Sequence, residues 1–501
     1  MRIAYFSPLP PQRSGIADYS AELLPALARQ LEVELIVPEG WRAAGGGPLA
    51  GMAAHAERAF PRLAAAGRFD AVLYHLGNNR DYHASIYRAL LEHPGVVALH
   101  EAVIHHLVRD LTLYAGDPAA YVGEMRYAYG LSGEAVARRC LSTGVPLDPW
   151  TYPLFERVVD RSLAVSVHNE FTRGRLLASR PRARVAVVPH HLSLGERPLP
   201  APAAARAALG LPPDAFVVAS FGFVTAAKRP EVLLRAFARL RRKVPRAVLL
   251  LAGEVSPHFD FGAVALPALM HGVTVTGRLE LDRFLLHMAA ADTAVNLRWP
   301  TSGETSGTLI RLLGMGKAVI VNRVGAFAEI PEGCCAQVDR DEGEEDLLVA
   351  FLERLAADAE LRQAMGDNAR RWVAAHNTLE GSARGYAELL RQVAADGAAP
   401  FRALPPLAPY GEDDVATDLL RAVSAEMCDL GVGEAEDDLL AAVAGALVEL
   451  SGRVGTGGYG GDGGGGAGKP GVSGGGGGSG AGQPGVSGGG EGAGAAGGPR
   501  R

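Results

Sequence analysis

The residues best placed to do chemistry lie in one stretch, Arg298–Thr308, which carries the carboxylate of Glu304 beside a glycine-containing turn. The apolar spacing after it predicts an amphipathic helix that begins near Ser306, followed by a buried strand at Ala318–Asn322. The free N–H groups of a helix N-terminus bind phosphate. A carboxylate just before the helix accepts hydrogen bonds from sugar hydroxyls. The stretch therefore predicts a sugar beside a diphosphate, which is the chemistry of a nucleotide-sugar site.

A second glycine-bearing loop, Phe221–Pro230, follows another predicted strand. Gly222 lets the backbone come close to a ligand. The cation of Lys228 or Arg229 neutralises a diphosphate. A single lysine before a helix is more often a surface residue, but its combination with the Glu304 loop favours phosphate contact.

Further candidates lie where other predicted strands end, because a ligand binds at the carboxyl ends of parallel strands. Gly15 stands in the loop after the first strand, His100 ends the strand at Gly95–His100, and Gly277 ends a strand of the second half. Glu101 follows His100 as a nearby acid. A lone histidine is more often structural than catalytic. The hypothesis that His100 contacts a ligand therefore depends on its position at a strand end.

The elements that hold these loops form two successive α/β series. Apolar strands alternate with helices in residues 1–195 and again in residues 196–395, which predicts two doubly wound parallel sheets facing across a cleft. A proline-containing run at Leu192–Ala208 is predicted to link them. The predicted strands are Arg2–Ser7, Leu31–Val37, Ala71–His75, Gly95–His100, Leu163–Val167, Val185–Val188, Phe216–Phe221, Ala247–Ala252, Val273–Thr276, Thr293–Asn296 and Ala318–Asn322.

Two segments follow the second series. Residues 400–452 are predicted to form an acidic helical appendage, whose role the sequence leaves open. Residues 455–501 are dominated by glycine, with serine, alanine and proline, and this composition cannot form a core. We expect this tail to be disordered and to take no part in catalysis.

Composition excludes several classes of protein. The formal net charge is −6, so no basic balance argues for nucleic-acid binding. The 4 cysteines have no metal-ligand spacing, which fits free thiols in a reducing cytoplasm. The N-terminus lacks a signal-peptide pattern, and no apolar run is long enough to cross a membrane. We expect a cytoplasmic protein, with peripheral contact at the inner face of a membrane left open. The oligomeric state is not readable.

The Glu304 loop and the helix after it resemble the signature of family 4 glycosyltransferases (glycosyl transferases group 1), which have the GT-B fold. In that signature a Glu-Gly-Phe-Gly run precedes a helix with a second Glu and then a Gly-x-Pro-Val strand. Glu304 matches the first Glu, Gly307 the second Gly, and Gly316–Val319 the strand entry. The second Glu, which usually holds the ribose, falls on Leu312, with Arg311 beside it.

Other loops resemble this family more weakly. Gly222 and Lys228 match a Gly-Arg-x-x-x-x-Lys loop, with Phe223 in the place of the arginine and Arg229 as its candidate substitute.

Four further positions match single features of the family. Gly15 matches a glycine loop over the donor diphosphate, and His100 resembles the cleft histidine that contacts the donor sugar or the reacting centre. Gly277 ends a strand where the nucleobase lies. Glu329 matches a Gly-x-x-x-Glu turn and is a candidate to replace the lost ribose contact.

The resemblance implies an acceptor-side domain over residues 1–195 and a nucleotide-sugar-binding domain over residues 196–395, whose last helix crosses back. It implies a retaining hexosyltransferase that moves a sugar from a UDP- or GDP-sugar to a glycan, lipid or small-molecule acceptor, without a metal or bound cofactor. The leaving phosphate would act as the base. The catalytic candidates are Glu304, Lys228 and His100. The donor-binding candidates are Gly15, Gly222, Arg229, Gly277, Ser306, Gly307, Thr308 and Glu329.

Alternatives remain open. The departures at Phe223, Arg311 and Leu312 are compatible with a catalytically impaired GT-B protein that only binds nucleotide sugars. A sugar-nucleotide epimerase or a phosphorylase would use the same fold. A dinucleotide-dependent oxidoreductase is disfavoured, because no Gly-x-Gly-x-x-Gly follows the first strand.

Overall fold

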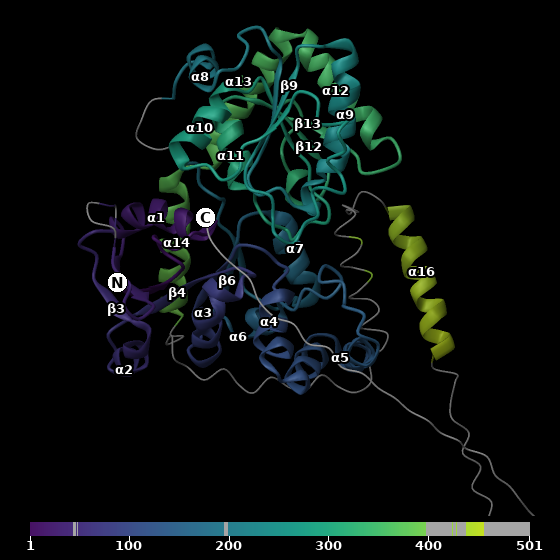
Figure 1. The fold of residues 1–501 in the computed structure, drawn as a ribbon. Coiled ribbons are helices and arrows are strands. Elements are labelled where there is room, and N and C mark those ends of the chain that lie inside the picture. Colours follow the sequence, from purple (N-terminus) through teal and green to yellow (C-terminus); the bar gives the residue numbers. More distant parts are fainter. Residues whose placement is uncertain are drawn as a thin grey trace, which may run out of the picture. The chain divides into compact units, whose positions relative to one another are not determined.

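The computed structural model describes residues 1–43, 47, 49–194, 199–396, 423, 427 and 437–454. Within them the chain forms two α/β domains, each built on a parallel sheet, and both sheets belong to one compact unit (Figure 1). This confirms the predicted fold class. The predicted appendage at 400–452 lies mostly outside the described residues, which include its helix α16 (Asp437–Val454). The predicted tail at 455–501 lies outside them.

The first sheet has 7 strands in the order β3-β2-β1-β4-β5-β6-β7, and each neighbouring pair is parallel. Its central strands are almost continuously apolar and buried, as expected when helices cover both faces of a sheet. The strands are β1 (Arg2–Phe6), β2 (Glu32–Val37), β3 (Ala54–Ala56), β4 (Ala71–Leu76), β5 (Val96–Leu99), β6 (Ala164–Val167) and β7 (Val185–Val187).

The helices of the first domain include a long insertion between β5 and β6. Its main helix, α5, breaks at Gly130, whose φ of 66° is outside the helical region. The helices are α1 (Gly15–Ala28), α2 (Phe60–Ala65), α3 (Arg80–Glu92), α4 (His105–Leu111), α5 (Pro118–Thr143), α6 (Glu156–Arg161) and α7 (Glu170–Ser179), with short 3-10 turns at Glu57–Ala59 and Leu113–Ala115.

The second sheet has 6 strands in the order β10-β9-β8-β11-β12-β13, again all parallel. Strand order reverses between β8 and β11, which is the point where open parallel sheets bind ligands. The strands are β8 (Val217–Phe221), β9 (Val248–Ala252), β10 (Val273–Val275), β11 (Thr293–Asn296), β12 (Ala318–Asn322) and β13 (Ala336–Val338).

Two prolines and two polar caps mark where helices of the second domain begin. Pro230 stands in the first turn of α9, where its missing N–H costs nothing. Ser306 caps α11 by accepting from the Leu309 N–H at 3.2 Å. The helices are α8 (Pro202–Leu209), α9 (Pro230–Lys243), α10 (Leu281–Ala290), α11 (Gly307–Gly314), α12 (Glu344–Ala357) and α13 (Ala359–His376), with 3-10 turns η3 (Ala226–Lys228) and η4 (Gly325–Phe327).

The structure departs from the predicted elements in two places. The predicted linker ends in helix α8, because Pro202 begins a helix in the alanine-rich run that follows it. The edge strands β3 and β13 were not predicted. Each has only three residues, too few to show a hydrophobic period.

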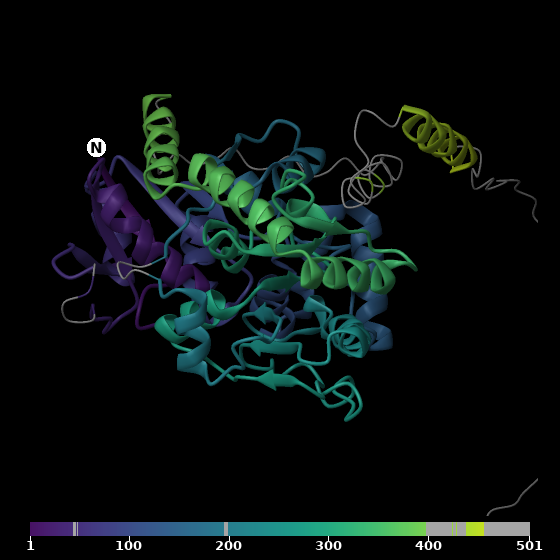
Figure 2. The same ribbon diagram turned by 90° about the horizontal axis from the view of Figure 1, so that it is seen from above.

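The last helix of the second series, α14 (Leu379–Ala395), packs in the core of the first domain. Tyr386, Leu390 and Val393 are buried in one cluster with residues of β1 and α1. The Tyr386 hydroxyl lies 3.1 Å from the hydroxyl of Tyr19 on α1. Figures 1 and 2 both show the green helix α14 beside the purple α1. The chain thus returns to its start and ties the two domains together.

Leu390→Ala is expected to lower the free energy of unfolding by about 2–5 kcal/mol, because the residue is fully buried and its removal leaves a cavity. Urea unfolding measures the loss. The control is Glu388→Ala on the exposed side of the same helix, which should change stability by less than about 0.5 kcal/mol. Equal effects of the two variants would contradict the packing of α14 into the first domain.

Candidate active site

The loop before α11 is attached to the first domain by several hydrogen bonds, three of which reach the carbonyls of Ser302 and Gly303. The Ala102 N–H donates to the Ser302 carbonyl at 2.7 Å. The side chains of Asn169 and Thr172 both donate to the Gly303 carbonyl, at 2.9 and 2.6 Å. Asn169 also caps α7 through its other side-chain atom. Loops at the carboxyl ends of strands from both sheets therefore meet here. We call this contact, between Ser302 and Gly303 of the second domain and Ala102, Asn169 and Thr172 of the first, the seam.

Glu304 stands in the middle of the seam. Its Oε2 accepts from the Ser302 N–H at 2.8 Å and from the Thr301 hydroxyl at 3.2 Å, and its Oε1 lies 2.8 Å from Nε of Arg298. These partners fix the direction of the carboxylate. Arg298 was not among the predicted site residues, although it begins the stretch Arg298–Thr308.

Lys228 approaches the same place from the end of η3. Its ammonium donates to the Phe221 carbonyl, and burial lowers its pKa to about 7, with the nearby charge of Arg298 lowering it further and that of Glu304 raising it. Gly222 has a φ of +81°, and a Cβ there would lie 2.8 Å from Nζ of Lys228. Glycine is therefore required where this lysine folds over the loop.

The start of α11 lies beside this lysine. A Cβ added at Gly222 would lie 3.8 Å from Oγ1 of Thr308. A Cβ added at Gly307 would lie 3.2 Å from the His190 ring. Gly222, Lys228, Gly307 and Thr308, predicted from separate segments, thus gather at one helix N-terminus. This arrangement offers backbone N–H groups and a cation to an anion.

A pocket of about 380 Å³ opens next to this group and is lined by both domains. Gly15 and Gly222 face it from the two sides, and Phe223 lies in it with 55% of its surface exposed. Gly277 immediately precedes Arg278 of the pocket wall. The remaining lining residues are Pro10, Pro11, Gln12, Arg13, Ser14, Asp18, Gly253, Glu254, Leu279, Glu280 and Phe284.

Two predicted donor contacts have protein partners in this structure. Arg229 forms an ion pair of 2.6 Å with Glu344. Glu329 accepts from the backbone N–H groups of Glu170 and Phe171 at 3.1 and 2.5 Å, where it closes the N-terminus of α7. A ligand contact by either side chain stays a prediction and would compete with these partners.

The position of the missing second Glu is taken by Leu312, and Arg311 stands beside it in the sequence. Leu312 is 1% exposed and belongs to the core of the second domain. Arg311 instead faces the first domain, where it donates to the Ser193 carbonyl at 3.0 Å and pairs with Glu22 of α1 at 2.8 Å. Glu22 also lies 3.2 Å from Nε2 of His191. Arg311 therefore links the second domain to the first.

His100 is the middle member of a chain of three imidazoles. Its Nε2 lies 3.0 Å from Nδ1 of His75, and its Nδ1 lies 3.2 Å from Nε2 of His168. His168 Nδ1 lies 2.9 Å from the Val188 carbonyl. A carbonyl only accepts, so His168 donates to it, His100 donates to His168 and His75 donates to His100. Both nitrogens of His100 are therefore engaged, and its contact with a ligand stays a prediction.

Burial keeps these rings neutral. It is the first cause of the lowered pKa values of His75, His100 and His168, with the neighbouring imidazoles as a further cause, and it lowers the pKa of His168 to about 4. The chain of hydrogen bonds requires neutral rings, because only a neutral imidazole donates with one nitrogen and accepts with the other.

Glu101 is the charged residue at the seam that was noticed at a strand end but not predicted as part of the site. Its Oε1 accepts from the Asn78 N–H at 3.1 Å. Burial, together with the nearby charge of Glu304, raises its pKa to about 7, while Arg298 acts in the opposite direction. The sequence signal was an acid directly after a buried strand.

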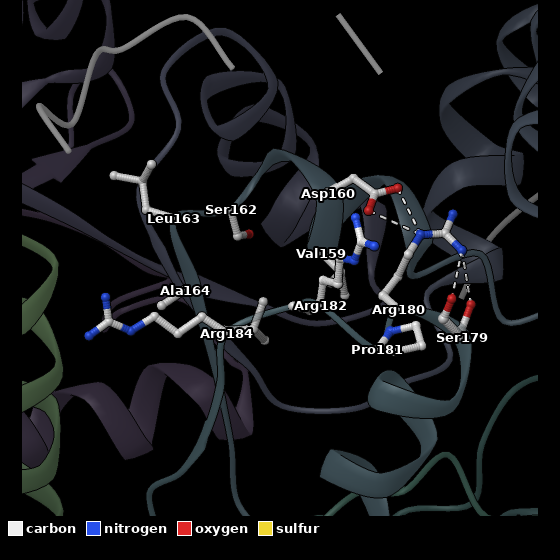
Figure 3. Close-up of a pocket in the computed structure, with 12 residues that line it drawn as sticks. Val159, Asp160, Ser162, Leu163, Ala164, Ser179, Arg180, Pro181, Arg182 and Arg184 are labelled. Atoms are coloured by element: carbon white, nitrogen blue, oxygen red, sulfur yellow. Dashed lines mark hydrogen bonds and ion pairs between the residues drawn. The ribbon is translucent and has the colours of Figure 1, made fainter. Parts of the chain in front are cut away.

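Other features of the described residues bear on the class of protein. They contain no group of three or more His, Cys, Asp or Glu side chains suited to a metal ion. No helix among them is long and apolar enough to cross a membrane. A hollow of about 490 Å³ lies at the amino ends of β6 and β7, where Arg180 pairs with Asp160 (Figure 3). It is at the opposite end of the sheet from the seam.

Residues 213–358, within the second domain, match the family model described as Glycosyl transferases group 1. The D-inositol 3-phosphate glycosyltransferase of Saccharomonospora viridis is 35% identical over 136 residues, which are 25% of this chain and 31% of that protein. The chain thus matches less than a third of that relative's length.

Solved structures align over most of the chain. Sucrose-phosphate synthase from Thermosynechococcus elongatus has a TM-score of 0.56 at 18% identity, covering 79% of this chain and 100% of that one. The Anabaena protein HepE, solved with UDP-glucose, has a TM-score of 0.53 at 14% identity, covering 78% of this chain and 100% of that one. These alignments show that the chain has the GT-B fold. The match to the glycosyl transferases group 1 model covers part of the second domain.

The histidine chain makes stability depend on pH. His168 has a pKa of about 4 when folded against an ordinary value of 6.5, so the unfolded chain binds a proton that the folded chain rejects between these values. Stability should fall as pH falls from about 6.5 toward about 4. Urea unfolding at several pH values measures this.

The matched variant is His168→Asn, whose amide can still donate to the Val188 carbonyl but does not titrate. It should unfold with a weaker pH dependence over the same range than the wild type. Identical slopes for the two proteins would contradict a neutral buried His168.

Proposed function

We propose that the protein is a retaining glycosyltransferase that moves a hexosyl unit from a UDP- or GDP-sugar to a glycan, lipid or small-molecule acceptor. The observation that carries the proposal is the meeting of Glu304, Lys228 and the N-terminus of α11 at the carboxyl ends of two facing sheets. A carboxylate for sugar hydroxyls and a cationic, N–H-rich site for a diphosphate then stand side by side.

In this proposal each group has a distinct task. The diphosphate lies against Lys228 and the start of α11, which stabilise the charge that develops as the anomeric bond breaks. Glu304 accepts hydrogen bonds from the sugar hydroxyls and orients the anomeric carbon. The nucleoside occupies the 380 Å³ pocket between the Gly15 and Gly222 loops. A bound diphosphate also favours the protonated form of Lys228.

The comparisons support the donor class without deciding it. The Anabaena protein HepE was solved with UDP-glucose, and the family match covers the domain that would hold the donor. The acceptor, the linkage and the retention of configuration are part of the proposal and are not given by the comparisons. No metal or bound cofactor is invoked, and the acceptor side is assigned to the first domain.

A catalytically impaired binding protein is the second candidate. Two departures from the family signature favour it. Arg311, beside the position where the signature has its second Glu, is paired with Glu22, and the exposed Phe223 occupies the position of the signature's arginine. Such a protein would bind a nucleotide sugar without transferring the sugar. An epimerase would instead convert the nucleotide sugar with no acceptor present.

Lys228→Ala is expected to abolish the stabilisation that a nucleotide gives to the wild type. A ligand at about a hundred times its dissociation constant adds roughly 2.7 kcal/mol. Thermal unfolding with UDP, GDP, ADP, dTDP and their common sugars measures this and identifies the base. The control is Lys243→Ala, whose exposed ammonium pairs with Glu353 and should leave the shifts unchanged. A shift that persists in Lys228→Ala would remove the lysine from the diphosphate site.

Glu304→Ala is expected to lower transfer by about 10²-fold or more while the protein still unfolds cooperatively, because the orienting carboxylate is lost. The release of nucleoside diphosphate from the sugar found in the binding panel measures the rate. Glu342→Ala, at an exposed position, is the control. Wild-type turnover in Glu304→Ala would refute the site.

A further inference from the structure

Glu101 is held at the seam by one oxygen and leaves the other one free. The Asn78 N–H donates to Oε1 at 3.1 Å, and Asn78 is itself fixed by accepting from the Leu107 N–H at 3.0 Å. The next residue, Ala102, donates to the Ser302 carbonyl across the seam. Within the part of the chain that the structure describes, Oε2 of Glu101 has no hydrogen-bond partner, and the residue is partly exposed.

The two carboxylates at the seam have unequal partners. Glu304 has Arg298 and the Ser302 N–H, whereas among the described residues Glu101 has only the Asn78 N–H. Two nearby carboxylates disfavour simultaneous ionisation, and the proton goes to the one with less support. Burial and Glu304 raise the pKa of Glu101 to about 7.

The other charged or titratable groups around Glu101 come from several segments. Arg298 and Glu304 face it from the loops after β11, and Lys228 interacts with both of these from η3. On the side of the first domain, His100 precedes it and is neutral within the imidazole chain, and His106 bonds to the side chain of Asn78 at 2.8 Å. Burial lowers the pKa of His106, so it adds no full charge near neutrality.

We propose that Glu101 is a catalytic residue whose free carboxylate oxygen takes the proton from the acceptor hydroxyl. The inference rests on the proposed glycosyl transfer and names a base for it. Glu101 belongs to the first domain, which is the proposed acceptor side, and Glu304 is the less suitable base because both of its oxygens are already engaged.

The step is balanced as follows. The acceptor O–H bond breaks and its proton passes to Oε2 of Glu101, while the oxygen lone pair forms the new bond to the anomeric carbon on the face that the diphosphate leaves, so that the configuration is retained. The bond from the anomeric carbon to the diphosphate oxygen breaks, and its electron pair leaves with the diphosphate beside Lys228. Glu101 then returns its proton to water. This assignment replaces the leaving phosphate, which the family resemblance implied as the base.

The assignment predicts a narrow bell-shaped dependence of kcat/KM on pH. The base must be deprotonated, so the rate rises as pH passes the pKa of Glu101 at about 7. Lys228 must be protonated, so the rate falls as pH passes its pKa, also about 7. Because the two groups share neighbours, the limbs give apparent values for the coupled system.

Glu101→Gln is expected to lower kcat by about 10²–10⁴-fold and to remove the acid limb while the alkaline limb remains. The amide oxygen still accepts from the Asn78 N–H, so thermal unfolding should match the wild type. The matched control is Glu57→Gln, since burial also raises the pKa of Glu57, which is bonded to Ser85 away from the seam. That control should keep the wild-type rate and profile.

The outcomes separate this inference from the proposed function. A wild type that neither binds nucleotide nor transfers sugar would refute the proposed function itself. An active wild type with an unchanged rate and acid limb in Glu101→Gln would overturn the inference and return the proton to the leaving phosphate. A slower Glu101→Gln that keeps its acid limb would also overturn it, because Glu101 would then only position the loop.

Discussion

The structure depends on the attachment of one loop to the opposite domain. The carbonyls of Ser302 and Gly303 receive three N–H or O–H groups from the first domain, and these bonds set where Glu304 stands. Backbone carbonyls in a buried seam must be satisfied, since an unpaired one costs free energy comparable to a lost hydrogen bond. Because these bonds cross the seam, the candidate residues at the strand ends of both sheets lie close together. Helix α14, which packs in the core of the first domain, also joins the two domains.

This closeness shapes the electrostatics of the site. Glu101, Glu304, Arg298 and Lys228 form a group of two acids and two bases within a partly buried seam. Burial penalises the charged form of any member that lacks a good partner, which is why Glu101 and Lys228 both titrate near neutrality. Two groups with shifted pKa values at the ends of strands from different sheets are typical of a catalytic centre.

The departures from the family signature have physical counterparts in the structure. Arg311 forms an ion pair with Glu22 of α1, so the residue beside the missing Glu joins the two domains. Arg229 and Glu329 stabilise the frame instead of standing free, through Glu344 and through the N-terminus of α7. Several predicted ligand contacts thus form hydrogen bonds and ion pairs within the protein around the site.

Much of the fold and part of the site could be predicted from the sequence, because both depend on local pattern. Apolar strands alternating with helices specify a doubly wound sheet, and glycines before helix starts mark the loops that approach a ligand. Gly15, Gly222 and Lys228 are candidates from these loops, and Gly307 and Thr308 are candidates from the family resemblance. The structure brings them to one pocket and one helix start.

Only the tertiary structure decided which side chains are already engaged. The imidazole chain that occupies His100, the partners of Arg229 and Glu329, and the proximity of Glu101 to Glu304 each join residues far apart in the sequence. Sequence spacing reports the period of a helix or strand, whereas burial and pairing depend on where separate elements meet. For this protein the sequence determined which loops form the candidate site, and the packing of two domains decided the charge and the hydrogen-bond partners of each group within it.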